Sequence, residues 1–314
     1  MAPGWIVPFG PLWGPYIAQT LVAQAGMYGG YELRWTDNDK LKKWGGKVQK
    51  GAAAGNFIHE LQEDLAKVGC YDAKLDGDYG GGTRDAVMRF QWCVSKGTHK
   101  SSISSSLLKE IVNDAMIFVT GNTDHATARH LKAWVKDGFE VTGTLRVVAF
   151  GKFSEFRKSA DFDKLDDPSV GDDDMVVHKD FVAGLAAINK AAADAGELFQ
   201  VNQTLRVAGA PVGGAVVKPA SKSQHLIGNA IDFNILHDSK PIHSSKMKWA
   251  DMPQKAKDFI TAVKAAGLRW GGDFADRDPI HFDAFLDPGG SDFNILYFLN
   301  QRTIQRRQPI LRAT

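Results

Sequence analysis

Two short stretches of the chain carry side chains that could bind a metal ion. The first contains His225 and Asp232, seven positions apart (232 − 225 = 7), and the second contains Asp278 and His281. Two imidazoles and one carboxylate form a ligand set that suits Zn²⁺, with a fourth position open to water or substrate. Such a site activates water near neutral pH, and that chemistry cleaves amides. Asp278 precedes His281 closely enough to act as acid and base in the same pocket.

The residues around these ligands indicate how they could converge. Gly228 and Ala230 permit a tight turn into a strand, so that His225 in a loop and an aspartate in a strand can reach one ion. Pro279 favours an extended approach of the chain to His281. We therefore expect one metal site built from two segments about fifty residues apart.

Apolar periodicity divides the chain into a helical first part and a mixed second part. Apolar residues at 58, 61, 65 and 68 lie on one face of a helix predicted over 56–69. A second helix starts at Thr83 and has Val87 and Phe90 on one side. Farther on, the spacing predicts helices over 181–192 and 256–266, and strands over 145–150, 201–207 and 230–236. A helix followed by strands broken by a helix indicates an α+β domain.

The helical part contains a short series of motifs in a fixed order, namely Leu61-Gln62, Gly69-Cys70, Asp76-Gly77, Thr83, Ala86-Val87 and Phe90-Gln91. Over about residues 55–113 this series resembles a peptidoglycan-binding domain built as a small three-helix bundle. The resemblance implies that the glycan peptide stem lies in a groove near the Asp-Gly loop. The binding positions that it implies are Asp76, Gly77, Asp78, Tyr79 and Thr83.

A fainter similarity follows within the same part of the chain. When Gly77, Thr83, Val87 and Phe90 are shifted by 44 positions, they fall on Gly121, Thr127, Leu131 and Trp134. The segment is either a degenerate second repeat or one more capped amphipathic helix. His125 and His130 are five apart, a spacing that suits neither one helix face nor a metal pair, and we interpret them as surface residues.

The metal-binding stretches also resemble a known family. Ser-x-His-x-x-Gly-x-Ala-x-Asp, from Ser223 to Asp232, followed by Asp-x-x-His-Phe from Asp278, resembles the zinc peptidases that include D-Ala-D-Ala carboxypeptidases and L-alanyl-D-glutamate endopeptidases. These enzymes are related in fold to Hedgehog domains, and the resemblance spans about residues 174–299. The segment Trp270-Gly-Gly-Asp-Phe274 is most similar to the endopeptidase branch found in phage endolysins.

The family resemblance implies further roles in the site. It implies Zn²⁺ as cofactor and an arginine that binds substrate and polarises the scissile carbonyl, and Arg206 is the matching candidate. The usual Gly-Tyr-Arg-Ser context is absent around Arg206, which sets this chain apart from the family pattern. Ser223 is expected to form a hydrogen bond near the site, and Asp283 to support a ligand histidine from behind.

Composition limits the classes of partner. The 314 residues have a formal net charge of +2, which does not suggest nucleic acid. Two cysteines, Cys70 and Cys93, could form a bridge or remain buried thiols. No charged residue precedes Glu32, and the early apolar stretch lacks the basic start of a secretory signal and is too short to span a bilayer. That stretch is either packed on the body of the protein or contacts a membrane.

The sequence therefore predicts a multidomain protein. The expected parts are an uncharged arm and linker (1–50), an all-α three-helix peptidoglycan-binding domain (51–116), a possible second repeat and linker (117–172) and an α+β zinc peptidase domain of the Hedgehog/D-Ala-D-Ala peptidase type (173–314). We expect a monomeric peptidoglycan hydrolase that cuts the stem peptide at L-Ala-D-Glu. The alternatives are a D,D- or L,D-carboxypeptidase, or a secreted antibacterial effector with the same chemistry. We expect action at the bacterial cell wall, reached through a holin or a secretion machine.

Overall fold

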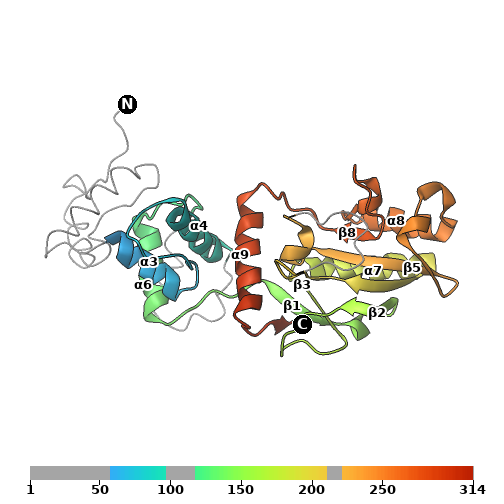
Figure 1. Ribbon diagram of the computed structural model, residues 1–314, viewed down its shortest axis with the longest axis horizontal. Coiled ribbons are helices and arrows are strands. Elements are labelled where there is room, and N and C mark those ends of the chain that lie inside the picture. The colour runs from blue at the N-terminus through green and yellow to red at the C-terminus, as the bar shows by residue number, and fades with distance from the viewer. Residues whose placement is uncertain (1–56, 97–116, 211–220, 314) are drawn as a thin grey trace. The chain divides into compact units, whose positions relative to one another are not determined.

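The computed structural model describes residues 57–96, 117–210 and 221–313 of the chain. The chain divides into two compact units, Met1–Val141 and Thr142–Thr314 (Figure 1). The second unit thus begins at Thr142, whereas the predicted peptidase domain begins at residue 173. The predicted N-terminal arm, residues 1–50, lies outside the described residues. Among the helices of the described residues, none is both long enough and apolar enough to cross a membrane.

The described part of the first unit is helical. Its described helices are α3 (Phe57–Lys67), α4 (Gly81–Ser95) and α6 (His125–Lys136). Ile58 and Leu65 of α3 are fully buried, as the apolar spacing predicts. Phe90 of α4 packs edge-on against Trp134 of α6, with ring centroids 5.1 Å apart. His130 of α6 is fully buried as well, so its interpretation as a surface residue was wrong.

A buried glutamine of α3 holds the loop between α3 and α4. The Gln62 side-chain amide donates to Asp76 Oδ1, to the Asp78 carbonyl and to Thr83 Oγ1 at 2.9–3.0 Å. Its Oε1 accepts a hydrogen bond from the Gly77 backbone N–H at 2.9 Å. Gly77 has φ +70°, a conformation that glycine adopts without strain. One side chain therefore satisfies both backbone and side-chain groups of the Asp-Gly loop.

The loop at residues 120–124, directly ahead of α6, is held in the same way. The Gln91 amide donates to the Asn122 carbonyl at 2.8 Å and to Thr127 Oγ1 at 3.0 Å. Gln91 Oε1 accepts from the Gly121 N–H at 2.9 Å, and Gly121 has φ +75°. These partners are 44 positions beyond the loop partners of Gln62. Helix α4 therefore contacts both loops: Thr83, near its start, bonds to Gln62, and its Gln91 holds the second loop.

The described residues of the second unit form two β-sheets and three α-helices. The smaller sheet has the order β3 (Asp174–His178), β1 (Leu145–Ala149) and β9 (Leu311–Arg312). The larger sheet has the order β2 (Phe156–Asp163), β4 (Leu198–Gln203), β5 (Ala230–His237), β8 (His281–Asp283) and β7 (Arg269–Trp270), and β6 (Lys240–Ile242) also pairs with β5. The helices are α7 (Phe181–Ala195), α8 (Gln254–Ala265) and α9 (Ser291–Gln305). Strands β2 and β4 are parallel, whereas the pairs β4–β5, β5–β8 and β8–β7 are antiparallel.

One predicted strand ends earlier than its sequence suggests. The apolar pattern predicts a strand over 201–207, but β4 spans Leu198–Gln203. After Gln203 the chain leaves the sheet, because the Arg206 N–H donates to the carbonyl of His225 at 3.0 Å. A strand pattern read from residue types cannot distinguish these two kinds of backbone hydrogen bond.

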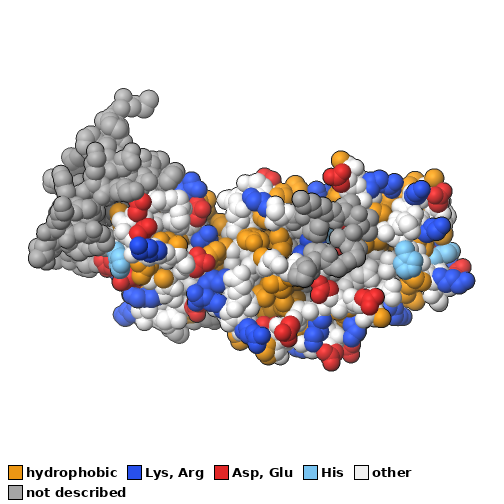
Figure 2. Space-filling view, viewed as in Figure 1, with side chains coloured by type: hydrophobic (Ala, Val, Ile, Leu, Met, Phe, Trp, Pro, Cys, Tyr) orange, Lys and Arg blue, Asp and Glu red, His pale blue; other side chains and the backbone are white. Residues whose placement is uncertain are grey.

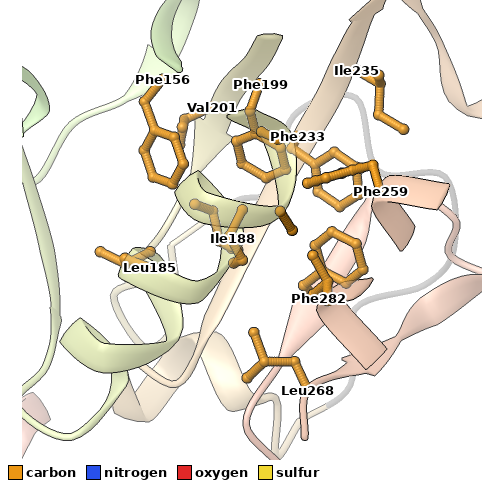
Figure 3. Close-up of a cluster of buried hydrophobic side chains, with 14 of the residues drawn as sticks. Phe156, Leu185, Ile188, Phe199, Val201, Phe233, Ile235, Phe259, Leu268 and Phe282 are labelled. Atoms are coloured by element: carbon orange, nitrogen blue, oxygen red, sulfur yellow. The ribbon is translucent and has the colours of Figure 1, made fainter. Parts of the chain in front are cut away.

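Aromatic rings fix the centre of the larger sheet (Figure 3). Phe199, Phe233 and Phe282 belong to the neighbouring strands β4, β5 and β8, and each consecutive pair stacks with ring centroids 4.5 Å apart. Phe259 of α8 meets Phe199 and Phe282 edge-on at 5.7 and 5.8 Å. Each fully buried ring contributes about 1.5–3 kcal/mol through the apolar surface that it removes from water. This stack keeps the three strands in fixed positions relative to one another.

The surface carries charges of both signs. In the view of Figure 2, basic and acidic side chains are intermingled over the described parts of both units. This distribution agrees with the small net charge of the whole sequence.

Candidate metal centre

The hydrogen-bonding register of the larger sheet brings together two of the predicted ligands. Asp232 of β5 is the direct cross-strand partner of His281 of β8. On the other side of β5, Asp232 is paired with Gln203, the last residue of β4. Because cross-strand partners project from the same face of a sheet, the carboxylate and the imidazole meet above it.

The third predicted ligand comes from a turn next to this row. His225 lies in a short 3-10 helix, η5 (Gln224–Ile227), and Ser223 Oγ caps that helix by accepting from the His225 N–H at 3.3 Å. Gly228 ends the helix with φ +79°, and a Cβ at this position would lie 2.6 Å from the backbone nitrogen of His178. Glycine is therefore required for the chain to turn from His225 into β5.

Three ligand atoms converge. His225 Nε2 and His281 Nδ1 each lie 3.0 Å from Asp232 Oδ1 and 3.1 Å from each other. The far nitrogens face acceptors, namely the Thr204 carbonyl at 2.5 Å from His225 Nδ1 and Asp283 Oδ2 at 3.1 Å from His281 Nε2. Protons on those far nitrogens leave a lone pair of each ring directed at the common point. The donor set therefore fits a metal ion, for which zinc ligand distances are about 2.0–2.2 Å.

The charges around Asp232 and His281 also favour a cation, either a proton or a metal ion. Burial alone would raise the pKa of Asp232, but His225 and His281 outweigh it and hold that pKa well below its usual range. Burial would lower the pKa of His281, but its hydrogen bonds to Asp232 and Asp283 raise it to about 9. A buried carboxylate that stays ionised between two imidazoles is a strong ligand for a divalent cation.

Asp278 lies beside this cluster. Its pKa is raised by burial and by the charge of Asp232, and its Oδ1 is buried without a hydrogen-bond partner among the described residues. The Asp278 N–H donates to the carbonyl of Gly271 at 2.9 Å, and its own carbonyl accepts from the His281 N–H at 3.1 Å. A Cβ on Gly271 would lie 2.1 Å from the Asp278 carbonyl oxygen, so that position admits only glycine. A partly buried carboxylate with a raised pKa and an unused, buried oxygen is suited to proton transfer.

Arg206 lies near the metal-binding cluster as well. Its Nε and Nη2 donate to Gln203 Oε1 at 3.3 and 3.2 Å. Burial lowers its pKa, and the charges of Asp232, Asp163 and Asp278 act against that change. The guanidinium is therefore close enough to the carboxylates of Asp232 and Asp278 for their charges to act on it.

The structure also contains supporting residues that sequence reasoning missed. Gln301 of α9 donates to the carbonyls of Leu226 and Arg206 at 2.6 and 2.9 Å and accepts from the Ala208 N–H at 2.7 Å. This one side chain thus ties the turn that carries His225 to the segment that carries Arg206. In the sequence Gln301 stands in a polar run, Asn300–Thr303, whose residue types give no sign of these contacts.

The predicted wall-binding residues do not all face solvent. Asp76 is exposed and Asp78 is partly exposed. Tyr79 is fully buried, and its hydroxyl donates to the Gly121 carbonyl at 2.8 Å. Thr83 is 2% exposed, and its hydroxyl donates to the Asp78 carbonyl. The side chains of Tyr79 and Thr83 therefore hold the loop, whereas the two aspartates remain accessible.

Comparisons with known proteins agree with both parts of the chain. Residues 217–284 match the family model described as D-alanyl-D-alanine carboxypeptidase, and this stretch includes the whole metal cluster and Asp278. Residues 54–92 match the model described as a putative peptidoglycan binding domain. No curated protein matches the chain. The two family matches together support a modular peptidoglycan peptidase.

Proposed function

We propose that the protein is a zinc-dependent endopeptidase that cuts the peptidoglycan stem peptide between L-Ala and D-Glu. The observation that carries this proposal is the convergence of His225 Nε2, Asp232 Oδ1 and His281 Nδ1 within 3.1 Å, beside the carboxylate of Asp278. A zinc protein that only bound the wall would have no need of a proton-accepting carboxylate next to its ligands.

The residues of the chain divide the chemistry among them. A bound Zn²⁺ supplies Lewis acidity, which polarises a carbonyl and makes water more acidic. Asp278 accepts the proton of the attacking water and later delivers it to the leaving amine, a role that its raised pKa favours. Arg206 offers positive charge to the oxygen of the scissile carbonyl. Asp283 orients the ring of His281.

Two observations bear on the position of the cut. The similarity of Trp270–Phe274 to the endopeptidase branch favours an internal bond. The same resemblance implies a fold of the Hedgehog/D-Ala-D-Ala peptidase type. The family match over residues 217–284 carries the description of a carboxypeptidase, which favours removal of a terminal D-Ala. A D,D- or L,D-carboxypeptidase is therefore the second candidate.

We further propose that the first unit holds the enzyme on the wall. The match over residues 54–92 supports this role, and Asp76 and Asp78 are the accessible polar side chains of the first loop. The same pattern of hydrogen bonds around Gln91 supports a second copy of the loop at residues 120–127. Action at the bacterial cell wall follows from both units. Delivery through a holin or a secretion machine stays a prediction.

Digestion of purified peptidoglycan tests the proposal. The metal-free protein and the zinc-loaded protein are incubated with the wall, and the released fragments are read by mass spectrometry. New N-terminal D-Glu in the zinc-loaded sample alone supports the endopeptidase. Release of D-Ala alone supports the carboxypeptidase, and no product from protein with zinc bound would overturn the enzymatic function.

A further inference from the structure

An arginine lies behind His281, the predicted ligand of β8. Arg269 of β7 is the cross-strand partner of Asp283 of β8. Its Nε and Nη2 donate to the two different oxygens of Asp283, each at 2.7 Å. The Asp283 side chain is only 1% exposed, whereas that of Arg269 is 41% exposed. The buried carboxylate is therefore held at both oxygens by a partly exposed guanidinium.

The same carboxylate faces the ligand histidine. Asp283 Oδ2, one of the two oxygens that Arg269 binds, lies 3.1 Å from His281 Nε2. A carboxylate bound by two parallel N–H groups cannot rotate freely about its Cβ–Cγ bond. Because Asp283 is fixed, the imidazole that donates to it is fixed too, with Nδ1 directed at Asp232.

Two aromatic rings hold the guanidinium in place. The Arg269 guanidinium carbon lies 4.0 Å from the ring centroid of Phe285 and 4.9 Å from that of Phe274. Phe285 is 53% exposed, and Phe274 is also 5.8 Å from the ring of His281. Contacts of this kind between a cation and aromatic faces restrict the orientation of the planar group.

We propose that Arg269 is a positioning residue for the metal site, acting through Asp283 to hold the imidazole of His281 in its ligand orientation. This inference rests on the proposed zinc site. Arg269 itself touches neither the ligand atoms nor Asp278. Its effect is on how tightly the ion is held.

A matched pair elsewhere in the second unit gives the control. Arg312 of β9 binds Asp174 of β3 with two hydrogen bonds of 3.0 and 2.8 Å, and Asp174 is likewise buried. No predicted ligand contacts that pair. The variants Arg269→Met and Arg312→Met therefore remove the same kind of interaction, next to the metal site and away from it.

The test measures the zinc dissociation constant of each full-length variant by competition with a chromophoric chelator. We expect Arg269→Met to weaken zinc binding by about 10–100-fold and Arg312→Met to leave it within about twofold of the wild type. Zinc affinity of Arg269→Met equal to that of the wild type would overturn the inference and leave the proposed function standing. A wild-type protein that binds no zinc would overturn both the inference about Arg269 and the proposed zinc-dependent function.

A second variant covers the case in which Arg269→Met does not fold. Arg269→Lys keeps the charge but cannot bind both oxygens of Asp283 in parallel. We expect zinc affinity of Arg269→Lys between those of the wild type and Arg269→Met. Unchanged affinity in Arg269→Lys, with Arg269→Met unfolded, would show that the arginine acts on stability alone.

Discussion

Asp232 and His281 are direct cross-strand partners in β5 and β8, and Asp232 Oδ1 lies 3.0 Å from His281 Nδ1. The row continues through Gln203, the partner of Asp232 in β4, to Asp163, the partner of Gln203 in β2. The separation of these two ligands is therefore set by the hydrogen bonds of a sheet. Of the three candidate ligands, only His225 comes from outside this row of paired residues.

Asp278→Ala separates metal binding from chemistry. We expect the variant to bind zinc as the wild type does and to lose at least about 100-fold in the rate of peptidoglycan hydrolysis, because the proton acceptor is gone. Asp276→Ala, two positions earlier and exposed, is the control and should keep full activity. Retained activity in Asp278→Ala would mean that another group takes the proton.

Gly271→Ala tests the close contact under Asp278. A Cβ would lie 2.1 Å from the Asp278 carbonyl oxygen, so the loop must move. We expect a loss of about 1–3 kcal/mol in the free energy of unfolding, as for other overpacked sites, together with reduced hydrolysis. Gly151→Ala is the matched control, since a Cβ there meets nothing within 4 Å. Equal urea midpoints for the two variants would contradict the prediction.

Gln301→Leu tests the tie between the two segments of the site. It leaves the carbonyls of Leu226 and Arg206 and the N–H of Ala208 without their present partner. Each buried group left unsatisfied costs about 1–3 kcal/mol. We expect lower stability in urea unfolding and a lower rate of hydrolysis. Gln305→Leu, at an exposed position of the same helix, should change neither quantity.

His178 predicts a dependence of stability on pH. Burial lowers its pKa to about 4, while Asp180 acts to raise it and Lys179 and Arg146 to lower it. The unfolded chain, with a pKa near 6.5, then binds the proton more readily, so stability is full above about pH 6.5 and falls as the pH drops toward 4. The loss from this residue is up to about 3 kcal/mol, at 1.36 kcal/mol per pKa unit.

Urea unfolding of the wild type and His178→Gln at pH 7 and pH 4.5 measures this dependence. We expect the wild type to lose more stability than His178→Gln between the two values. His243→Gln, which alters an exposed histidine, should follow the wild type. Parallel pH curves for the wild type and His178→Gln would contradict the assigned pKa.

The sequence predicts that the three candidate ligands converge, for a physical reason. His225, Asp232 and His281 lie in motifs whose glycine and proline residues constrain the backbone locally, so that spacing and residue type carry information about geometry. The bounds of α7, α8 and β5 were predicted closely as well. Their apolar periodicity depends only on neighbours along the chain.

The supporting residues could not be predicted in this way. Arg269 and Gln301 act through partners at least 14 positions away, and such contacts depend on strand register and on helix docking. The end of β4 at Gln203 could not be predicted either, because it depends on a hydrogen bond from Arg206 to the distant His225 segment. Tyr79 fits a loop pattern by type, but only the packed bundle shows that its hydroxyl points inward.

The contacts between the two loops have a consequence for anyone who would transplant the proposed wall-binding unit onto another protein. Tyr79 in the first loop donates to the Gly121 carbonyl in the second, and the Val141 N–H closes the unit on the Val68 carbonyl at 2.8 Å. A portable module cut after residue 116 would lose the partners of Tyr79 and of Gln91 together. The smallest transferable piece therefore runs through Val141.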